Sequence, residues 1–181
     1  LKNTTTNAKT SDGDYVEYTC KDADGNVLGA KLVQIDELKH GETKDVTFYA
    51  PIGTASIEAG VKELNYVPVI TLPAIGSDID VTKKKNRIRV SAAEASFNED
   101  GTIHVALTFK NYTSNWITEE TDYVEYTCYD KNGKAVRKGK IMIGVIDTKK
   151  NPVKTFEFDV PAYVTEVRLT SSKIVYWTEW S

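Results

Sequence analysis

The chain has 181 residues, of which 40% are hydrophobic and 27% charged, an ordinary globular composition with enough length for two small cores. Its formal net charge of −3 argues against the clustered basic surface that nucleic-acid binding requires, so we expect no nucleic acid as a partner. No apolar run approaches the roughly 20 residues that cross a bilayer, so no membrane span is expected in the chain.

The sequence contains one unchanged repeat. Residues 14–20, DYVEYTC, recur as residues 122–128, and the segments before them, 1–13 and 109–121, align without a gap. The offset of 108 residues, from position 14 to position 122, is too long for a solenoid repeat and close to the roughly 100 residues of one immunoglobulin-like (Ig-like) sandwich. We therefore expect two tandem domains.

The first copy carries several strand patterns. Apolar and polar residues alternate in three segments, 14–20, 27–38 and 46–50, and this period of two predicts β-strands. Further strands are expected around Ile57 and Leu64. Polar turns rich in Gly, Asn and Asp separate the segments, as in β-hairpins.

In the second copy, two strand patterns precede the repeated region and have no counterpart in the first copy. The second copy therefore has seven predicted strands, at residues 87–97, 102–109, 122–128, 135–146, 156–160, 167–169 and 174–176. No segment shows sustained helical periodicity, so we expect almost no helix.

These patterns predict an all-β fold of two tandem antiparallel Ig-like, or fibronectin-like, β-sandwiches. We expect residues 1–73 to form a first Ig-like repeat that lacks its first two strands, residues 74–86 a linker, and residues 87–181 a second, complete seven-strand repeat. The missing strands have two interpretations: a first domain whose beginning is trimmed, or an unpaired sheet edge that accepts a strand from another chain.

The two cysteines, Cys20 and Cys128, occupy the same place in the two copies, on the apolar side of their strands. We expect buried, unpaired thiols, because a disulfide between matched interior positions would require both cores to open. The turn that begins at Asp22 starts like a calcium loop, but Val33 stands where that loop requires a bidentate glutamate. No metal site is therefore expected.

The chain has no Gly-x-Ser-x-Gly or His-Glu-x-x-His motif, and neither of its two histidines has a visible partner in the sequence. Three acidic residues, Glu119, Glu120 and Asp122, share one predicted loop, a pattern typical of a solvated charge run. We therefore expect no enzyme and no cofactor. Asn3 and Asn111 begin glycosylation sequons, but we expect each asparagine to open a turn.

Four aromatic residues of the second copy are the candidate ligand-binding residues. Tyr112 and Trp116 lie in a predicted polar loop, and Trp177 and Trp180 close the chain, whereas the first copy has no aromatic residue at these positions. Trp177 alternates away from its apolar neighbours and should leave the sandwich interior. Exposed aromatic rings bind sugars by stacking, but they also pack against further domains, and both interpretations stay open.

Residues 126–130 (YTCYD), followed by 132–134 (NGK) and preceded by 109–111 (FKN), resemble the FxLYD-type domain of bacterial secreted proteins and lipoproteins. Tyr126 stands for the Phe of that motif and Cys128 for its Leu. Related Ig-like domains of Gram-positive surface proteins resemble the chain as well. The resemblance implies an extracellular or cell-surface β-sandwich module with no established catalytic residues.

Three functional hypotheses follow. The first is a non-catalytic spacer or adhesion module of a bacterial surface or secreted protein. The second is carbohydrate binding through the aromatic residues of the second copy, with a cell-wall or host glycan, or a surface protein, as the partner. The third is an accessory domain of a larger secreted enzyme.

Overall fold

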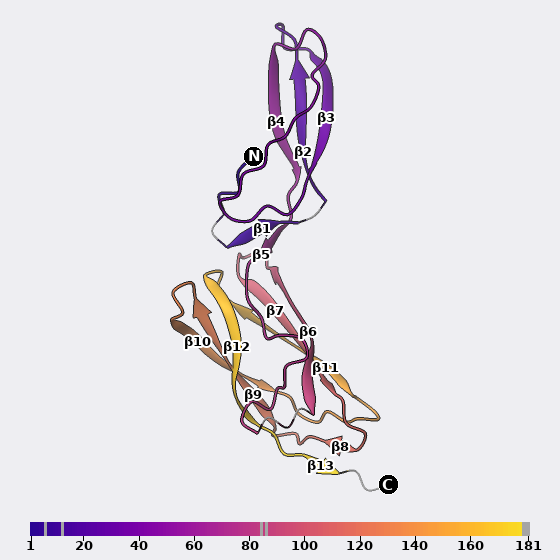
Figure 1. The fold of residues 1–181 in the computed structure, drawn as a ribbon, viewed down its shortest axis with the longest axis vertical. Helices are drawn as coiled ribbons and strands as arrows, with labels where there is room; N and C mark the ends of the chain where they lie inside the picture. The colour runs from indigo at the N-terminus through magenta and orange to yellow at the C-terminus, as the bar shows by residue number, and fades with distance from the viewer. Residues whose placement is uncertain (6, 12, 84, 86, 179–181) are drawn as a thin grey trace. The chain divides into compact units, whose positions relative to one another are not determined.

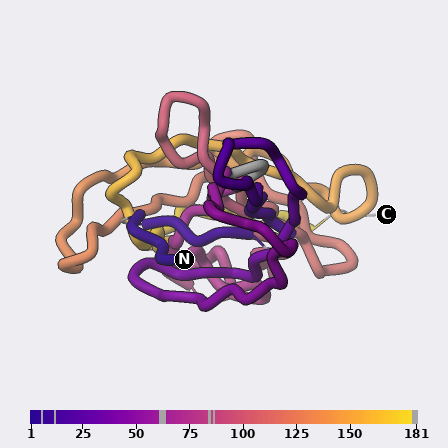
Figure 2. Tube along the Cα trace, turned by 90° about the horizontal axis from the view of Figure 1, so that it is seen from above, coloured from indigo at the N-terminus to yellow at the C-terminus, as the bar shows by residue number. Residues whose placement is uncertain are grey.

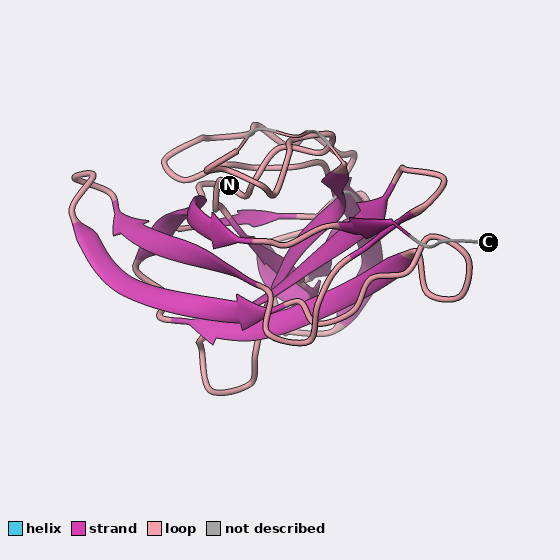
Figure 3. Ribbon diagram, turned by 90° about the horizontal axis from the view of Figure 1, so that it is seen from below, coloured by secondary structure: helices cyan, strands magenta, loops and turns pink. Residues whose placement is uncertain are grey.

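A computed structural model shows that the protein is all-β, as the period-two patterns predict (Figure 3). The structure describes residues 1–5, 7–11, 13–83, 85 and 87–178. These residues contain thirteen strands and no helix. The chain divides into two compact units, Leu1–Val69 (the first unit) and Ile70–Ser181 (the second unit), whose paths are coloured in sequence order in Figure 2.

The second unit contains two three-stranded antiparallel sheets (Figure 1). One sheet has the order β11-β7-β6, from β6 (Ile88–Phe97), β7 (Ile103–Asn111) and β11 (Val153–Val160). The other has the order β10-β9-β12, from β9 (Tyr123–Asp130), β10 (Ala135–Met142) and β12 (Val164–Lys173). A two-stranded ribbon joins β8 (Trp116–Ile117) to β13 (Trp177–Thr178).

The core of the second unit lies between these two sheets. Burial alternates along the whole of β7, which places Val105, Leu107 and Phe109 on the inner side. The opposite sheet contributes Val124 and Tyr126 of β9 to the same cluster. The two sheets therefore pack face to face, as in a β-sandwich.

The segment after Ile70 belongs to this sandwich. Thr71 pairs in parallel with β12, and Gly76 and Ile79 donate backbone hydrogen bonds to β6, so the segment passes from one sheet to the other. Ile79 is fully buried in the core. The segment predicted as a linker, 74–86, thus belongs to the second unit, because Ile79 completes the core.

The first unit has one three-stranded sheet and one two-stranded ribbon. The sheet has the order β3-β2-β4, from β2 (Asp14–Lys21), β3 (Val27–Ile35) and β4 (Ser56–Glu63). The ribbon pairs β1 (Ala8–Thr10) with β5 (Tyr66–Pro68). Ala8 lies opposite Pro68, as Trp116 lies opposite Thr178 in the second unit.

The strand predicted at residues 46–50 is wrong. These residues form no strand, although their counterparts, 156–160, lie in β11. In the second unit β11 is held by β7 along its whole length. In the first unit residues 1–3 pair with residues 41–44 through a bridge between Lys2 and Thr43 and backbone hydrogen bonds of Leu1 and Asn3, and no such backbone bond reaches the described residues 46–50. Alternation alone does not make a strand when its hydrogen-bonding partner is missing.

Candidate functional site

Two of the candidate aromatic residues, Trp116 and Trp177, lie in the β8–β13 ribbon of the second unit. Trp116 lies in β8 and not in the loop that the sequence predicted. Trp116 is opposite Thr178, and Trp177 is opposite Ile117. Successive residues of a strand point to opposite sides, so the two tryptophan side chains lie on opposite faces of the ribbon. They do not form one stacking platform.

The Trp116 ring is occupied by other side chains. The guanidinium carbon of Arg87 lies 3.5 Å from its centroid, a close cation–π contact. The Tyr176 ring meets it edge-on, with centroids 6.3 Å apart and planes at 87°. Burial, followed by the nearby carboxylates of Asp80 and Asp78, raises the pKa of Tyr176. Trp116 is therefore a packing residue, which favours the non-binding interpretation of this position.

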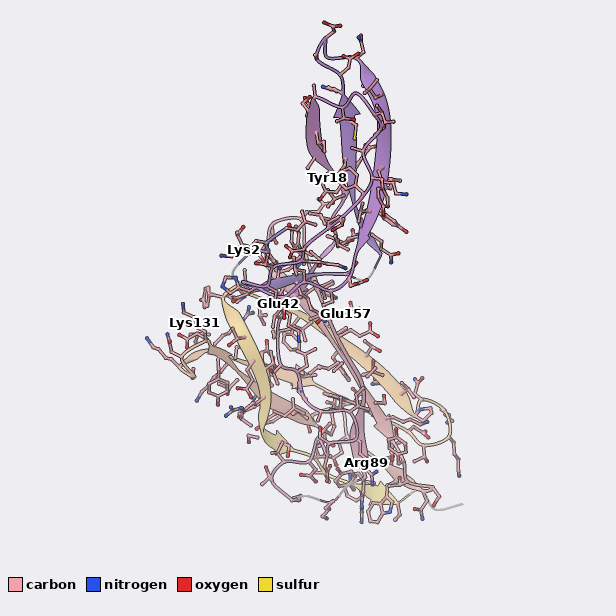
Figure 4. All side chains as sticks on the ribbon, turned by 45° about the horizontal axis from the view of Figure 1, so that its top comes forward. Lys2, Tyr18, Glu42, Arg89, Lys131 and Glu157 are labelled. Carbon is pink, nitrogen blue, oxygen red and sulfur yellow. The ribbon has the colours of Figure 1, made fainter. Side chains whose placement is uncertain are left out.

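Trp177 and Tyr112 are the exposed members of the set. Trp177 is 56% exposed, as its alternation predicted, and its indole N–H donates to Oε1 of Glu119. Tyr112 is 53% exposed, and the Lys110 ammonium lies 5.1 Å from its ring centroid, with the Arg89 guanidinium at 5.6 Å (Arg89 is labelled in Figure 4). Trp180 lies outside the described residues.

Asp122 has a structural role that the sequence did not reveal. The prediction of a solvated acidic run is wrong for this residue, whose side chain is fully buried. Its carboxylate accepts backbone N–H groups from Glu119 at 2.8 Å and Val175 at 3.1 Å. Burial raises its pKa, and the two backbone donors oppose that rise. In the first unit Asp14 makes the corresponding bonds. The recurrence of the aspartate at matched positions of the repeat could therefore have indicated this structural role from the sequence.

The sequon asparagines are also structural. Asn111 is buried, its Nδ2 donates to the Trp116 carbonyl at 2.8 Å, and its Oδ1 accepts the N–H of Thr113 at 3.0 Å. Asn3 makes the same pair of bonds, to the Ala8 carbonyl and from the Thr5 N–H. The prediction that each asparagine opens a turn is confirmed. Both amide nitrogens are engaged inside the fold, which leaves them poorly placed for glycosylation.

The other polar candidates lie apart. Both cysteines are buried, as predicted, and burial raises the pKa of the Cys128 thiol. His104 Nδ1 lies 3.0 Å from Asp159 Oδ1 on the neighbouring strand, a partner that the sequence did not reveal. Hydrogen bonds from Asn98 and then His104 lower the pKa of Asp159.

The Asp22 carboxylate accepts hydrogen bonds from the backbone of its own turn. Oδ1 accepts the backbone N–H groups of Asp24 at 2.9 Å and Asn26 at 2.8 Å, and the bonds from Asn26 lead the lowering of the Asp22 pKa. Within the described ranges, no group of three or more His, Cys, Asp or Glu side chains is placed to hold a metal ion. In the same part of the chain, no helix has the length and apolarity needed to cross a membrane.

Comparison with known proteins leaves the family open. A scan against protein-family models finds no matching family, and searches of curated proteins and of solved structures find no match either. The resemblance to FxLYD-type and related Ig-like domains therefore has no support from these comparisons and stays a prediction.

Proposed function

We propose that the chain is a pair of tandem Ig-like domains that act as a non-catalytic spacer or adhesion module of a bacterial surface or secreted protein. One observation carries the proposal: four buried polar side chains at matched positions of the two units make hydrogen bonds to the backbone. Asp122 and Asn111 fix the loops between the strands of the second unit, and Asp14 and Asn3 do so in the first. Side chains committed in this way hold a shape and are not available to a substrate.

A matched threonine in each unit adds to these polar contacts. Thr118 Oγ1 donates to the Gly144 carbonyl at 2.6 Å and accepts the Ile146 N–H at 2.7 Å. Thr10 repeats this arrangement in the first unit with the Asp36 carbonyl and the Leu38 N–H. Matched bonds in both units favour a shared architectural role over an activity specific to one of them.

Carbohydrate binding through the second unit is the alternative, and it now rests on Trp177. The indole is more than half exposed, with its N–H directed at the Glu119 carboxylate, which combines an apolar face with a polar group as sugar sites do. Tyr112 offers a separate exposed ring. Trp116 favours the alternative less, because the Arg87 guanidinium occupies a face of its ring.

The test is a binding screen of the chain against cell-wall polysaccharides and host glycans. The spacer proposal predicts no glycan binding and an unchanged result for Trp177→Ala and Tyr112→Ala. The matched control is Tyr163→Ala, which removes another exposed tyrosine of the second unit. Binding that is lost in Trp177→Ala and kept in Tyr163→Ala would overturn the spacer proposal in favour of the carbohydrate-binding alternative.

A further inference from the structure

The side of the β11-β7-β6 sheet that faces away from the core carries opposite charges at its two ends. Burial alternates along β7, so Lys110 and His104 lie on this side, and the exposed Tyr112 continues the alternation. The strand register places outward side chains of β6 and β11 beside those of β7. We call this side of the sheet the outer face.

One end of the outer face is basic and aromatic. Arg89 of β6 lies opposite Lys110 of β7. Both cations lie near the exposed ring of Tyr112, the Lys110 ammonium at 5.1 Å and the Arg89 guanidinium at 5.6 Å from its centroid. This end therefore presents two positive charges beside an aromatic ring.

The other end is acidic and hollow. Glu94 of β6, Ala106 of β7 and Glu157 of β11 lie side by side in the register. Together with Ser96 and His104 they are among the residues that line a cavity of about 290 Å³. The Glu157 side chain is 65% exposed. An open cavity between two carboxylates can accept an ammonium group, to which they offer charge-assisted hydrogen bonds.

The row between the two ends is neutral and has small side chains. Ala92, Thr108 and Thr155 lie side by side there, and the two threonine hydroxyls are bonded to each other at 2.9 Å. Along β7, Lys110 lies two residues from Thr108 in one direction and Ala106 two residues in the other, about 7 Å each way. Opposite charges therefore lie at equal distances from the central row.

A two-fold axis that crosses the strands at this central row makes the outer face complementary to itself. The rotation places Lys110 of one copy over the hollow between Glu94 and Glu157 of the other, and Arg89 over Glu94 (Arg89 and Glu157 are labelled in Figure 4). An axis along the strands would instead bring the two basic ends together, which like charges disfavour. The charge pattern thus selects the first arrangement.

We propose that the second unit pairs with a second copy of this chain through the outer face, sheet against sheet, with the Lys110 side chain of each copy in the acidic hollow of the other. The small side chains of the central row let the two sheets approach to the roughly 10 Å that separates packed sheets. The inference goes beyond the proposed function and does not depend on it, because a chain that binds no glycan can still form this pair.

Charge complementarity decides the occupant. A partner with charge of one sign, such as a nucleic acid or a basic peptide, is attracted to one end of the outer face and repelled by the other. A second copy presents both signs at the required spacing. The face from residue 104 to residue 112 covers roughly 400 Å² on three strands, which places the pair among small, transient interfaces.

Sedimentation equilibrium of the full chain at about 1 mM, in about 50 mM and about 500 mM NaCl, tests the proposal. Two face variants reverse the charge of one end each: Lys110→Glu at the basic end, and Glu94→Lys with Glu157→Lys at the acidic end. The matched control is Lys131→Glu, which makes the same charge change in the exposed turn after β9.

We expect the unmodified chain and Lys131→Glu to dimerise equally. The higher salt concentration should lower the association constant by about tenfold, and each face variant alone should lower it by about tenfold or more. An equimolar mixture of the two face variants should dimerise again, because the reversed charges then face opposite charges in the other chain. A surface other than the outer face would not give this recovery.

A further variant acts at the two-fold axis. Thr155 is exposed and would face its own copy across the axis, so Thr155→Arg should prevent dimerisation by like-charge contact while the tryptophan fluorescence of the folded second unit is kept. A monomeric unmodified chain at about 1 mM would overturn the proposal. Dimerisation that Thr155→Arg and the face variants leave unchanged, or a dimer lost in folded face variants and not recovered in their mixture, would also overturn it.

Discussion

The two units present one strand sequence in two environments. Residues 14–20 and 122–128 are identical, and each strand lies at the centre of a three-stranded sheet with matched neighbours. In the second unit a covering sheet buries the strand's inner side, and in the first unit the counterpart of β11 lies over it without strand pairing. The strand sequence specifies its own sheet, but the core depends on a second layer that comes from elsewhere in the chain.

Local polar structure does not depend on that layer. The bonds of Asp14 and Asn3 match those of Asp122 and Asn111, although only the second pair lies in a complete sandwich. These bonds join residues close to one another or on adjacent loops, so they form wherever the local backbone is correct. The difference between the units is therefore one of covering layers and not of loop chemistry.

The largest effect is expected for an acidic residue on the inner side of β12. Val167→Asp places an unpaired charge among fully buried side chains and should lower the free energy of unfolding of the second unit by about 3–5 kcal/mol. Ile57→Asp, at the matched and half-exposed position, should lower that of the first unit by less than about 1 kcal/mol.

Denaturant unfolding separates the two results. All three tryptophans follow residue 115, so their fluorescence reports the second unit, and amide exchange in β2 reports the first. Equal losses of unfolding free energy from the two substitutions would show that Ile57 is as buried in solution as Val167. The proposed difference between the two units would then be contradicted.

A smaller difference is expected for the stacked phenylalanines. Phe158→Ala removes a ring that stacks on Tyr126 from a strand fixed by β7, and should cost the second unit about 3 kcal/mol. Phe48→Ala removes the matching ring from a segment without strand pairing, and about 1 kcal/mol is expected for the first unit. Measured by the same two probes, a cost at Phe48 as large as that at Phe158 would contradict this ranking.

The smallest of the three effects concerns the residue opposite the repeated tyrosine. A Cβ at Gly139 would lie 2.3 Å from Cζ and Oη of Tyr126, so Gly139→Ala should destabilise the second unit by about 1–3 kcal/mol. The matched residue in the first unit is Lys31, an exposed side chain opposite Tyr18. Lys31→Ala should therefore change the stability of the first unit by less than about 0.5 kcal/mol. Thermal unfolding of both variants measures the difference, and a neutral Gly139→Ala would show that the Tyr126 ring is free to move.

Much of the fold could be predicted because its determinants are local. The alternation in 102–109 and 156–160 predicts strands, which the structure shows as β7 and β11, and polar turns mark their ends. The same reasoning failed at 46–50, where the pattern is equally clear but the pairing strand is missing. It also missed β8, whose two residues form a strand only through their pairing with β13, distant in the sequence.

The candidate site was less predictable for a related reason. Alternation placed Trp177 outside the sandwich, which the structure confirms. The sequence could not distinguish the packed Trp116 from the exposed Trp177. The Trp116 ring is covered by Arg87, which comes from a different segment of the chain. The burial of Asp122 likewise depends on a backbone donor from Val175, which no local pattern reveals.

Native-state thiol labelling tests most directly whether the first unit is open where the second is closed. Cys20 and Cys128 occupy matched places, both are buried, and each reacts only when its surroundings open. Labelling with a thiol reagent, followed by mass spectrometry of the two peptides and normalised to labelling in denaturant, should show Cys20 reacting about a hundredfold faster than Cys128. Equal rates, or a faster Cys128, would contradict the account, because the two cores would then be equally closed.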